Sequence, residues 1–282
     1  IGLPSLLLGS HMKNFKKAYG DWALVTGASS GIGKAISHQL ADQGVNLVAV
    51  ARNAINLKAL KAELEIKGIE VLTISADLFS PDSSQLIDDK TQHLDVGLLV
   101  ANAGVENTGA FIDNSVKHEQ KLLSLNINSP MELSHIFAKR FAQKGKGGIL
   151  LLSSLFGYQG VPMVANYSAS KAYILSLGEA LNVELKPLGI DVSVLSPGLT
   201  NTPMTQNMVV DFKKVPITSH QPEVVARVGL NALGKKATVV PGFINKFYAW
   251  ENRLIPRSWP VKLFGFLIKR AMTVKTHLQQ SI

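Results

Sequence analysis

Apolar residues recur along the chain in two patterns, short continuous runs and longer stretches with helical spacing. The short runs have few polar interruptions, which is typical of parallel strands buried on both faces. They predict strands over 22–25, 45–51, 69–75, 96–100, 148–153, 190–195 and 238–242. The longer stretches predict helices over 34–43, 54–67, 82–93, 115–143 and 164–186, with another starting at 221–223. This alternation predicts an α/β fold, a doubly wound, mostly parallel, seven-stranded sheet with helices on both faces.

The length of 282 residues allows one large α/β domain with a substantial core. No internal repeat or linker divides the chain, so we expect a single domain over 13–282. Residues 1–12 end in the letters G-S-H-M, which are typical of an expression-tag remnant, and they are left out of the fold prediction.

The net charge of +9 is compatible with nucleic acid, an anionic membrane or an anionic cofactor. No run of five or more basic residues occurs, so no nucleic-acid partner is expected. The chain has no cysteine, which excludes disulfides and thiolate metal sites, and no metal is expected. No apolar stretch of 18 residues occurs, so a membrane-spanning helix is not expected. We expect a cytoplasmic protein.

A glycine-rich turn, T-G-A-S-S-G-I-G over 26–33, lies between the first predicted strand and helix. A helix N-terminus offers unpaired N–H groups and a positive dipole end, and glycines let a pyrophosphate approach the backbone. Such a turn can also be purely structural. The candidate cofactor contacts here are Gly27, Ser29, Ser30, Gly31, Ile32 and Gly33.

The second predicted strand ends in Arg52 and Asn53, about 20 residues past the glycines, where an acidic residue would hold the ribose 2′-hydroxyl of NAD. A cation at this position suits the 2′-phosphate of NADP instead. We therefore expect NADP(H) to be preferred over NAD(H), the alternative being a solvated arginine.

Further down the chain, Tyr167 and Lys171 are spaced to share one helix face, and Ser154 lies 13 residues before Tyr167. Together with T-G-x-x-x-G-x-G and the segment Ala101–Gly104, this order resembles the short-chain dehydrogenase/reductase family. The resemblance covers roughly 20–205 and implies a Rossmann-type fold and hydride transfer with a nicotinamide cofactor. Alanine replaces the first asparagine of the family's N-N-A-G motif, which puts one polar contact in doubt.

The resemblance implies further cofactor contacts. Asp77 would contact the adenine amino group with Leu78 near the ring, although a turn aspartate is an equal alternative. Small residues would allow close passage of the cofactor, and the Asn102 amide can tie neighbouring strands together. A Pro-Gly turn and threonine hydroxyls would hold the carboxamide and phosphates. The contacts implied in the first of these segments are Asn102, Ala103 and Gly104. Those implied in the Pro-Gly turn are Pro197, Gly198, Thr200 and Thr202.

The implied catalytic residues are Asn126, Ser154, Tyr167 and Lys171. A nearby ammonium stabilises a phenolate, so Lys171 is expected to lower the pKa of Tyr167, which exchanges a proton with the substrate oxygen. Ser154 would orient that oxygen. Asn126, preferred over Asn128, would mark a distortion in the helix over 115–143 and hold a proton-relay water.

We therefore expect an NADP-dependent oxidoreductase that reduces a carbonyl of an apolar small molecule, or oxidises the corresponding secondary alcohol. A catalytically silent dinucleotide sensor is the alternative, but a sensor would need the glycines and not the catalytic residues. The opening at 19–22 and the tail resemble the steroid and long-chain 3-oxoacyl reductase branch. The helices over 115–143 and 164–186 form the family's usual dimer surface, so a homodimer or homotetramer is expected.

Two regions lie outside the family's shared core. Residues 204–221 are expected to form a substrate lid, the alternative being an ordinary surface loop. The tail over 243–282 interleaves aromatic residues with lysine and arginine, and no acidic residue follows Glu251. It is expected to be helical and either to cover the substrate pocket or to contact a membrane surface peripherally.

Overall fold

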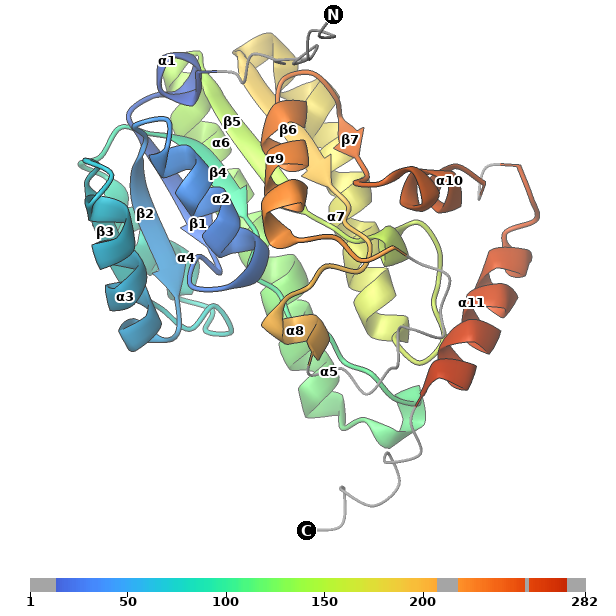
Figure 1. Cartoon of the computed structure of the whole chain (residues 1–282). Helices are drawn as coiled ribbons and strands as arrows, with labels where there is room; N and C mark the ends of the chain where they lie inside the picture. Colours follow the sequence, from blue (N-terminus) through green and yellow to red (C-terminus); the bar gives the residue numbers. More distant parts are fainter. Residues whose placement is uncertain (1–13, 207–217, 252–253, 273–282) are drawn as a thin grey trace, which may run out of the picture.

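A computed structural model describes residues 14–206, 218–251 and 254–272 (Figure 1). Its centre is one sheet in which every strand pairing is parallel. The strands are β1 (Trp22–Thr26), β2 (Asn46–Ala51), β3 (Val71–Ser75), β4 (Val96–Ala101), β5 (Gly147–Leu152), β6 (Ile190–Leu195) and β7 (Thr238–Val239). The expected seven-stranded, doubly wound sheet is confirmed, and it is wholly parallel across the described residues.

The strand order is β3-β2-β1-β4-β5-β6-β7. The chain builds outward from β1 to β3, then returns to the middle and builds β4 to β7 on the other side. The reversal lies between β1 and β4, where Val25 pairs with Val100. Ligands of open parallel sheets bind outside the carboxyl ends of the strands at such a reversal.

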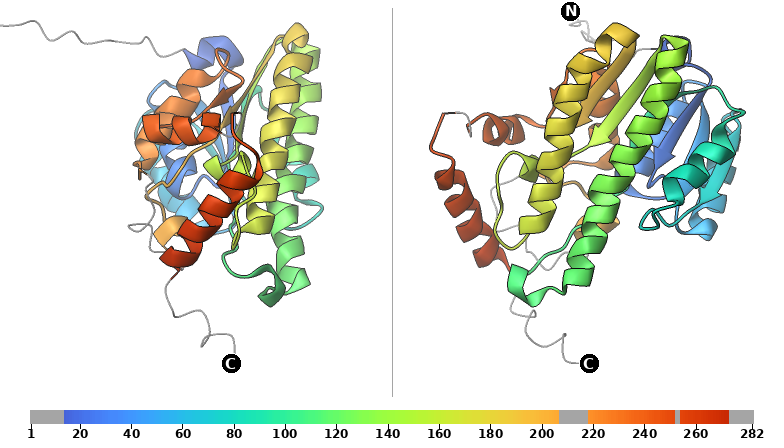
Figure 2. Two further views of the ribbon diagram at one scale, coloured as in Figure 1. Left: turned by 90° about the vertical axis from the view of Figure 1, so that its right-hand side faces the viewer. Right: turned by 180° about the vertical axis from the view of Figure 1, so that it is seen from behind.

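Helices cover both faces of the sheet. One layer holds α2 (Gly31–Ala41), α3 (Ala54–Glu65) and α9 (Pro222–Ala232), and the other holds α4 (Ser83–Thr91), α5 (Val116–Leu123), α6 (Ser129–Lys144) and α7 (Ala165–Glu184). Figure 1 views the sheet from the first layer and the right panel of Figure 2 from the second. Alternate strand residues serve the two cores: Ala23 and Val25 pack under α2, whereas Leu24 faces α4 and α6.

The predicted helix over 115–143 is interrupted. A π-helical turn, Ser124–Asn128, separates α5 from α6, and Pro130 occupies the first turn of α6, where its missing N–H costs nothing. The distortion expected at Asn126 is therefore present. The sequence patterns did not predict the short helix α1 (Phe15–Tyr19), whose two aromatic residues are buried at the amino end of the sheet.

The tail forms two helices after β7, α10 (Phe243–Glu251) and α11 (Ser258–Ala271), which lie beside the carboxyl ends of the strands (Figures 1 and 2). The expected helical extension is found as far as the described residues reach. Residues 1–12, which were expected to be a tag remnant, and most of the expected lid lie outside them. Residues 204–206 of the expected lid belong to the short α8 (Pro203–Gln206).

Candidate active site

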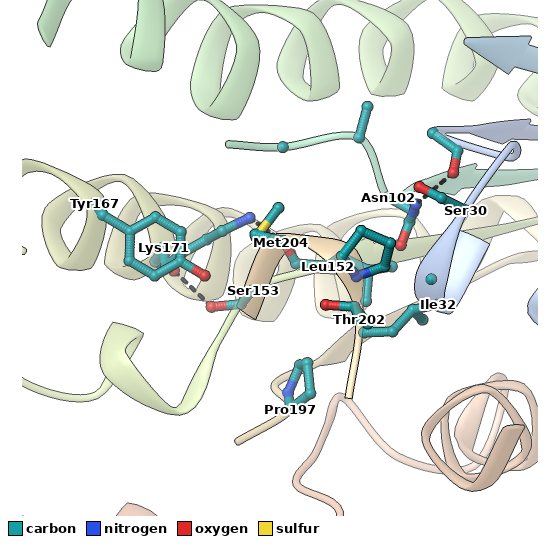
Figure 3. A pocket seen from close by; sticks show the side chains of 15 residues that line it. Ser30, Ile32, Asn102, Leu152, Ser153, Tyr167, Lys171, Pro197, Thr202 and Met204 are labelled. Atoms are coloured by element: carbon teal, nitrogen blue, oxygen red, sulfur yellow. Dashed lines mark hydrogen bonds between the residues drawn. The ribbon is translucent and has the colours of Figure 1, made fainter. Parts of the chain in front are cut away.

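A cavity opens at the carboxyl ends of β1 and β4, where the strand order reverses (Figure 3). Many residues predicted from sequence line it together: Gly27, Ser30, Gly31, Ile32, Asn102, Ala103, Gly104, Tyr167, Lys171, Pro197 and Thr202. The lining also includes Met204 from the expected lid, and Leu152, Ser153 and Pro203, which sequence reasoning missed. These three are neighbours of predicted residues, so adjacency was the only signal for them.

The glycine positions of the turn leave little room for a side chain. Gly27 and Gly31 have φ angles of 64° and 52°, in the left-handed region that favours glycine. A Cβ on Gly33 would lie 2.3 Å from the Gly27 carbonyl oxygen, so it could not be accommodated. Because α2 begins at Gly31, the N–H groups of its first turn face this end of the sheet.

Asn102 fastens the cavity floor across the two central strands. Its side-chain amide donates to the Thr26 carbonyl oxygen at 2.9 Å. In return, the Thr26 hydroxyl accepts from the backbone N–H groups of Asn102 and Ala103, both at 3.0 Å. The ends of β1 and β4 are therefore locked together, as the sequence predicted for Asn102.

Arg52 and Asn53 follow β2 and are both exposed. The Arg52 guanidinium lies over the Phe79 ring, 5.3 Å from its centroid, so the ring supports the cation without neutralising it. The Asn53 side chain caps α3 by accepting from the Asn56 N–H at 3.0 Å. Arg52 thus presents its guanidinium at the end of β2, the neighbour of β1, and none of the ion pairs among the described residues involves it.

Asp77 and Leu78 follow β3 and do not line the cavity. The Asp77 carboxylate accepts from the Phe79 N–H at 3.3 Å, which is the turn role weighed as its alternative. Leu78 is buried in the core against the second layer of helices. Other predicted site residues that do not line the cavity are Ser29, Gly33, Asn126, Ser154, Gly198 and Thr200.

Asn126 is buried in the π-helical turn, while the competing Asn128 is exposed. The Asn126 amide accepts from the Val105 N–H at 2.9 Å and donates to the Val105 carbonyl oxygen at 2.8 Å. It also donates to the Ser170 hydroxyl at 3.1 Å. Asn126 therefore joins the segment after β4 to the helix that carries Tyr167 and Lys171.

Burial raises the pKa of Tyr167 to about 12, although a hydrogen bond with the Ser154 hydroxyl acts in the opposite direction. The lowering of this pKa expected from the neighbouring ammonium does not set the net shift, because desolvation of the phenolate is the larger effect. Tyr167 is therefore a neutral phenol throughout the physiological pH range.

Lys171 lies one helical turn after Tyr167, and its Nζ is 5.7 Å from the centroid of the phenol ring. The ammonium donates to the Leu152 carbonyl oxygen at 3.0 Å. Burial lowers the pKa of Lys171 to about 8, because the charged form loses hydration. Gly104 lies directly beside this side chain, since a Cβ there would lie 3.2 Å from the Asn126 Oδ1 and 3.4 Å from the Lys171 Nζ.

Glu106 is a functional candidate that sequence reasoning missed. Its partly buried carboxyl accepts a 2.6 Å hydrogen bond from the Thr108 hydroxyl, and its charge raises the pKa of Tyr167. Burial raises the pKa of Glu106 itself. No motif marks this residue, so only its placement beside the phenol reveals it.

The tail reaches the predicted Pro-Gly turn through Asn245 on α10. This side chain is completely buried and donates to the Pro241 carbonyl oxygen at 2.9 Å. A Cβ on Gly198 would lie 2.5 Å from its amide nitrogen, so the predicted Pro-Gly turn rests directly on α10. Thr200 beside it is buried and its hydroxyl donates to the Gly198 carbonyl oxygen at 3.2 Å.

Two further properties of the described residues limit what the site can be. Within 14–206, 218–251 and 254–272, no group of three or more His, Asp or Glu side chains is placed to hold a metal ion. None of the helices in the same ranges is both long enough and apolar enough to cross a bilayer.

The model of the short chain dehydrogenase family matches residues 21–211. A 7beta-hydroxysteroid dehydrogenase of Clostridium sardiniense is 32% identical over 247 residues, which cover 87% of this chain and 94% of the relative. A very-long-chain 3-oxoacyl-CoA reductase of Neurospora crassa is 30% identical over 256 residues, covering 89% of this chain and 75% of the relative.

A solved structure gives the same result in three dimensions. A short-chain dehydrogenase from Sphingobium yanoikuyae in complex with NADPH superposes with a TM-score of 0.75 at 29% identity. The match covers 83% of this chain and 93% of that one.

Proposed function

The chain belongs to the short-chain dehydrogenase family and is an NAD(P)-dependent oxidoreductase of alcohols and ketones, and on that premise we propose that it uses NADPH to reduce the carbonyl of an apolar small molecule. The observation that carries this proposal is the cavity itself. It brings the glycine turn after β1 and the pair Tyr167 and Lys171 on α7 into one space. A dinucleotide sensor would need the turn but not this pair.

The residues present fit a dinucleotide. Gly27 and Gly31 form a backbone cradle at the start of α2, where N–H groups and the helix dipole favour a pyrophosphate. Asn102, Ala103 and Gly104 would form the floor beneath the cofactor, and Pro197 and Thr202 would hold its nicotinamide end. Arg52 supports the choice of NADP, because a cation rather than a carboxylate follows β2.

When bound, the nicotinamide supplies the hydride, and the protein manages the proton and the charge on the substrate oxygen. In this mechanism the neutral Tyr167 phenol donates its proton to the carbonyl oxygen. Ser154 donates a hydrogen bond to the same oxygen and stabilises the charge that develops on it. The buried Lys171 ammonium favours the phenolate left behind. Asn126 holds the segment after β4 against the helix that carries Tyr167 and Lys171.

The protonation state of Tyr167 favours reduction. Its pKa of about 12 keeps the phenol protonated, and reduction of a carbonyl needs a proton donor. Alcohol oxidation needs the phenolate, so its rate should rise toward alkaline pH. An apolar substrate is supported by the packing around the phenol, where Tyr167 adjoins a cluster that includes Phe156, Met163 and Phe264.

A peripheral contact with an anionic bilayer is part of the proposal. The inner faces of α10 and α11 are buried, but their outer faces expose aromatic and aliphatic side chains. Phe243, Phe247, Trp250, Leu254, Trp259 and Phe266 are each more than half exposed. Lys262, Lys269 and Arg270 are exposed on α11 beside them, a combination that suits the interface of an anionic membrane.

Self-association through α6 and α7 is also proposed. The outer face of α7 presents an exposed row of small or uncharged side chains, Ala165, Ala169, Tyr173, Ser176 and Ala180. This row of uncharged side chains, with the exposed Glu179 at its edge, supports a two-fold interface between copies of this chain.

The test of the proposed function is NADPH oxidation with a panel of carbonyl compounds, from small ketones to hydroxysteroid-sized ketones and long-chain 3-oxoacyl thioesters. We expect turnover with apolar ketones and a higher kcat/KM with NADPH than with NADH. Cofactor binding without turnover of any member of the panel would contradict the proposal.

A further inference from the structure

Four hydrogen bonds from three asparagines converge on Glu119 of α5. Its Oε1 accepts from the side-chain amides of Asn107 at 2.9 Å and Asn114 at 2.8 Å. Its Oε2 accepts from the Asn166 amide at 2.6 Å, and the same amide donates to the Glu119 backbone oxygen at 3.2 Å. A carboxylate can only accept and an amide nitrogen can only donate, so the donors and acceptors are matched.

The three asparagines come from two segments that form the reaction site. Asn107 and Asn114 lie in the loop between β4 and α5, whose first residues line the cavity. Asn166 lies in the first turn of α7 and directly precedes Tyr167. The carboxylate of Glu119 therefore ties the loop to the helix turn that carries the proposed proton donor.

A second contact joins the same two segments nearby. The Gly109 N–H donates to the Met163 carbonyl oxygen at 2.8 Å. Met163 has a φ angle of 70°, and it is the only residue other than glycine in the described ranges with a positive φ. A side chain in this left-handed conformation is strained and persists only where surrounding contacts hold it.

The loop also carries Glu106, whose charge acts on the Tyr167 hydroxyl. Asn107, the next residue, is one of the three donors to Glu119. The position of the Glu106 charge relative to the phenol therefore depends on the same carboxylate. Glu119 acts on the site from both sides, through Asn166 on the helix and through Asn107 in the loop.

We propose that Glu119 is a positioning residue of the active site, which clamps the loop over 105–114 to the first turn of α7 and so fixes the Tyr167 hydroxyl against the substrate carbonyl. This inference rests on the proposed function for its kinetic consequence, but the clamp itself does not. A displacement of about 1 Å in a reacting group can cost about a hundredfold in rate, so loss of the clamp should reach catalysis.

The experiment compares Glu119→Ala and Glu119→Gln with the wild type and with Glu179→Ala, a control at an exposed position of α7. We expect Glu119→Ala to lower kcat about 10- to 100-fold, with the dissociation constant of NADPH changed less than about twofold. Glu119→Gln keeps the shape and one acceptor oxygen, so it should recover part of kcat. A merely structural role would lower the melting temperature without changing kcat per folded molecule, and that result would overturn the proposal.

Hydrogen exchange separates the clamp from the proposed function. In Glu119→Ala, amides of the loop over 105–114 and of the first turn of α7 should exchange faster together, whereas Glu179→Ala should leave both unchanged. If the wild type reduces no carbonyl, the proposed function fails, and the exchange result still decides whether the clamp exists. Unchanged exchange in Glu119→Ala would refute the clamp even in an active enzyme.

Discussion

The pKa values of single residues in this site depend more on burial than on the pairing of opposite charges. Tyr167 and Lys171 are close to each other, yet the pKa of each moves in the direction that disfavours its charged form. Desolvation therefore outweighs the attraction between phenolate and ammonium in this structure. The result is a phenol that stays protonated at neutral pH beside a lysine that loses its proton more readily than an exposed lysine does.

The first prediction concerns that donor. Tyr167→Phe keeps the ring in its apolar surroundings and removes the proton, so kcat for carbonyl reduction should fall about 10²- to 10⁴-fold. The NADPH dissociation constant, measured by quenching of NADPH fluorescence, should change little, because the hydroxyl contributes little to cofactor binding. Turnover near the wild-type rate would show that another group donates the proton.

The second prediction concerns Glu106. An ionised carboxylate near the phenol opposes formation of the phenolate and so raises the pKa of Tyr167. Glu106→Gln removes that charge, and the pKa of Tyr167 should fall. Alcohol oxidation needs the phenolate, so its rising alkaline limb should move to lower pH. Stopped-flow pH profiles with Glu179→Gln as a control measure the shift, and a limb at unchanged or higher pH contradicts the assignment.

The third prediction concerns the choice of cofactor. Arg52→Asp replaces a cation with a carboxylate, which repels a 2′-phosphate and accepts from a 2′-hydroxyl. The ratio of kcat/KM for NADPH over NADH should fall about 10- to 100-fold, the size expected for one charge-assisted hydrogen bond. Phe79→Leu is the matched control, because it removes the ring beneath Arg52 and keeps the charge. An unchanged ratio in Arg52→Asp would mean that another group reads the phosphate.

Whole elements position these residues by meeting others that are distant in sequence. The π-helical turn between α5 and α6 lets Asn126 reach both Val105 and Ser170, which a regular helix would not present in the same way. In the tail, α10 supports Gly198 through Asn245, while α11 packs Phe264 edge-on against Phe156 with ring centroids 6.1 Å apart. Each tail helix thus has one face that builds the site and another that is exposed.

The fourth prediction uses these two faces. The triple variant Trp250→Ser, Trp259→Ser and Phe266→Ser changes only exposed aromatic residues, so kcat for a water-soluble ketone should stay within about twofold of the wild type. Co-sedimentation with anionic vesicles at low salt should be lost, because partitioning depends on those side chains. Ile55→Ser, at an exposed isoleucine on α3, should sediment like the wild type. A wild-type chain that stays in the supernatant would refute the membrane contact, and the tail would then serve only the pocket.

At the scale of the whole molecule, both helical layers have one side against the sheet, and α6 and α7 turn their other sides outward (Figure 2). The uncharged row on α7 is continuous over most of that helix. Two such rows facing each other about a two-fold axis would bury small side chains and let the helices pack closely.

The fifth prediction tests this assembly. The wild type should sediment at micromolar concentration as at least a dimer. Tyr173→Glu places a charge in the middle of the uncharged row and should shift the mass toward the monomer without a loss of helix content. Ile66→Glu, at an exposed isoleucine on the opposite layer, should leave the mass unchanged. A monomeric wild type would contradict the proposed interface.

The sequence by itself determined the local elements and the chemistry that they carry. Strands buried on both faces are rich in apolar residues, so the bounds Ile190–Leu195 were predicted correctly even though Asp191 and Ser193 interrupt the apolar run. A turn such as Thr26–Gly33 needs glycine wherever φ is positive or a backbone passes close, and a pair such as Tyr167 and Lys171 shares a helix face by spacing alone. These properties depend on residues that are close together in the chain, so the amino-acid sequence determines them directly.

Only the tertiary structure decided which segments meet and how strongly they are desolvated. Leu152 and Pro203 line the cavity because β5 ends and α8 begins there, which no local pattern encodes. The net shift of the Tyr167 pKa is opposite to the direction expected from the sequence, since burial depends on every segment packed around the phenol. Glu106 and Glu119 follow no motif, because their roles arise from a loop and a helix brought together by the fold. Periodicity reports what each segment can form, whereas contact and solvent exclusion are properties of the assembled chain.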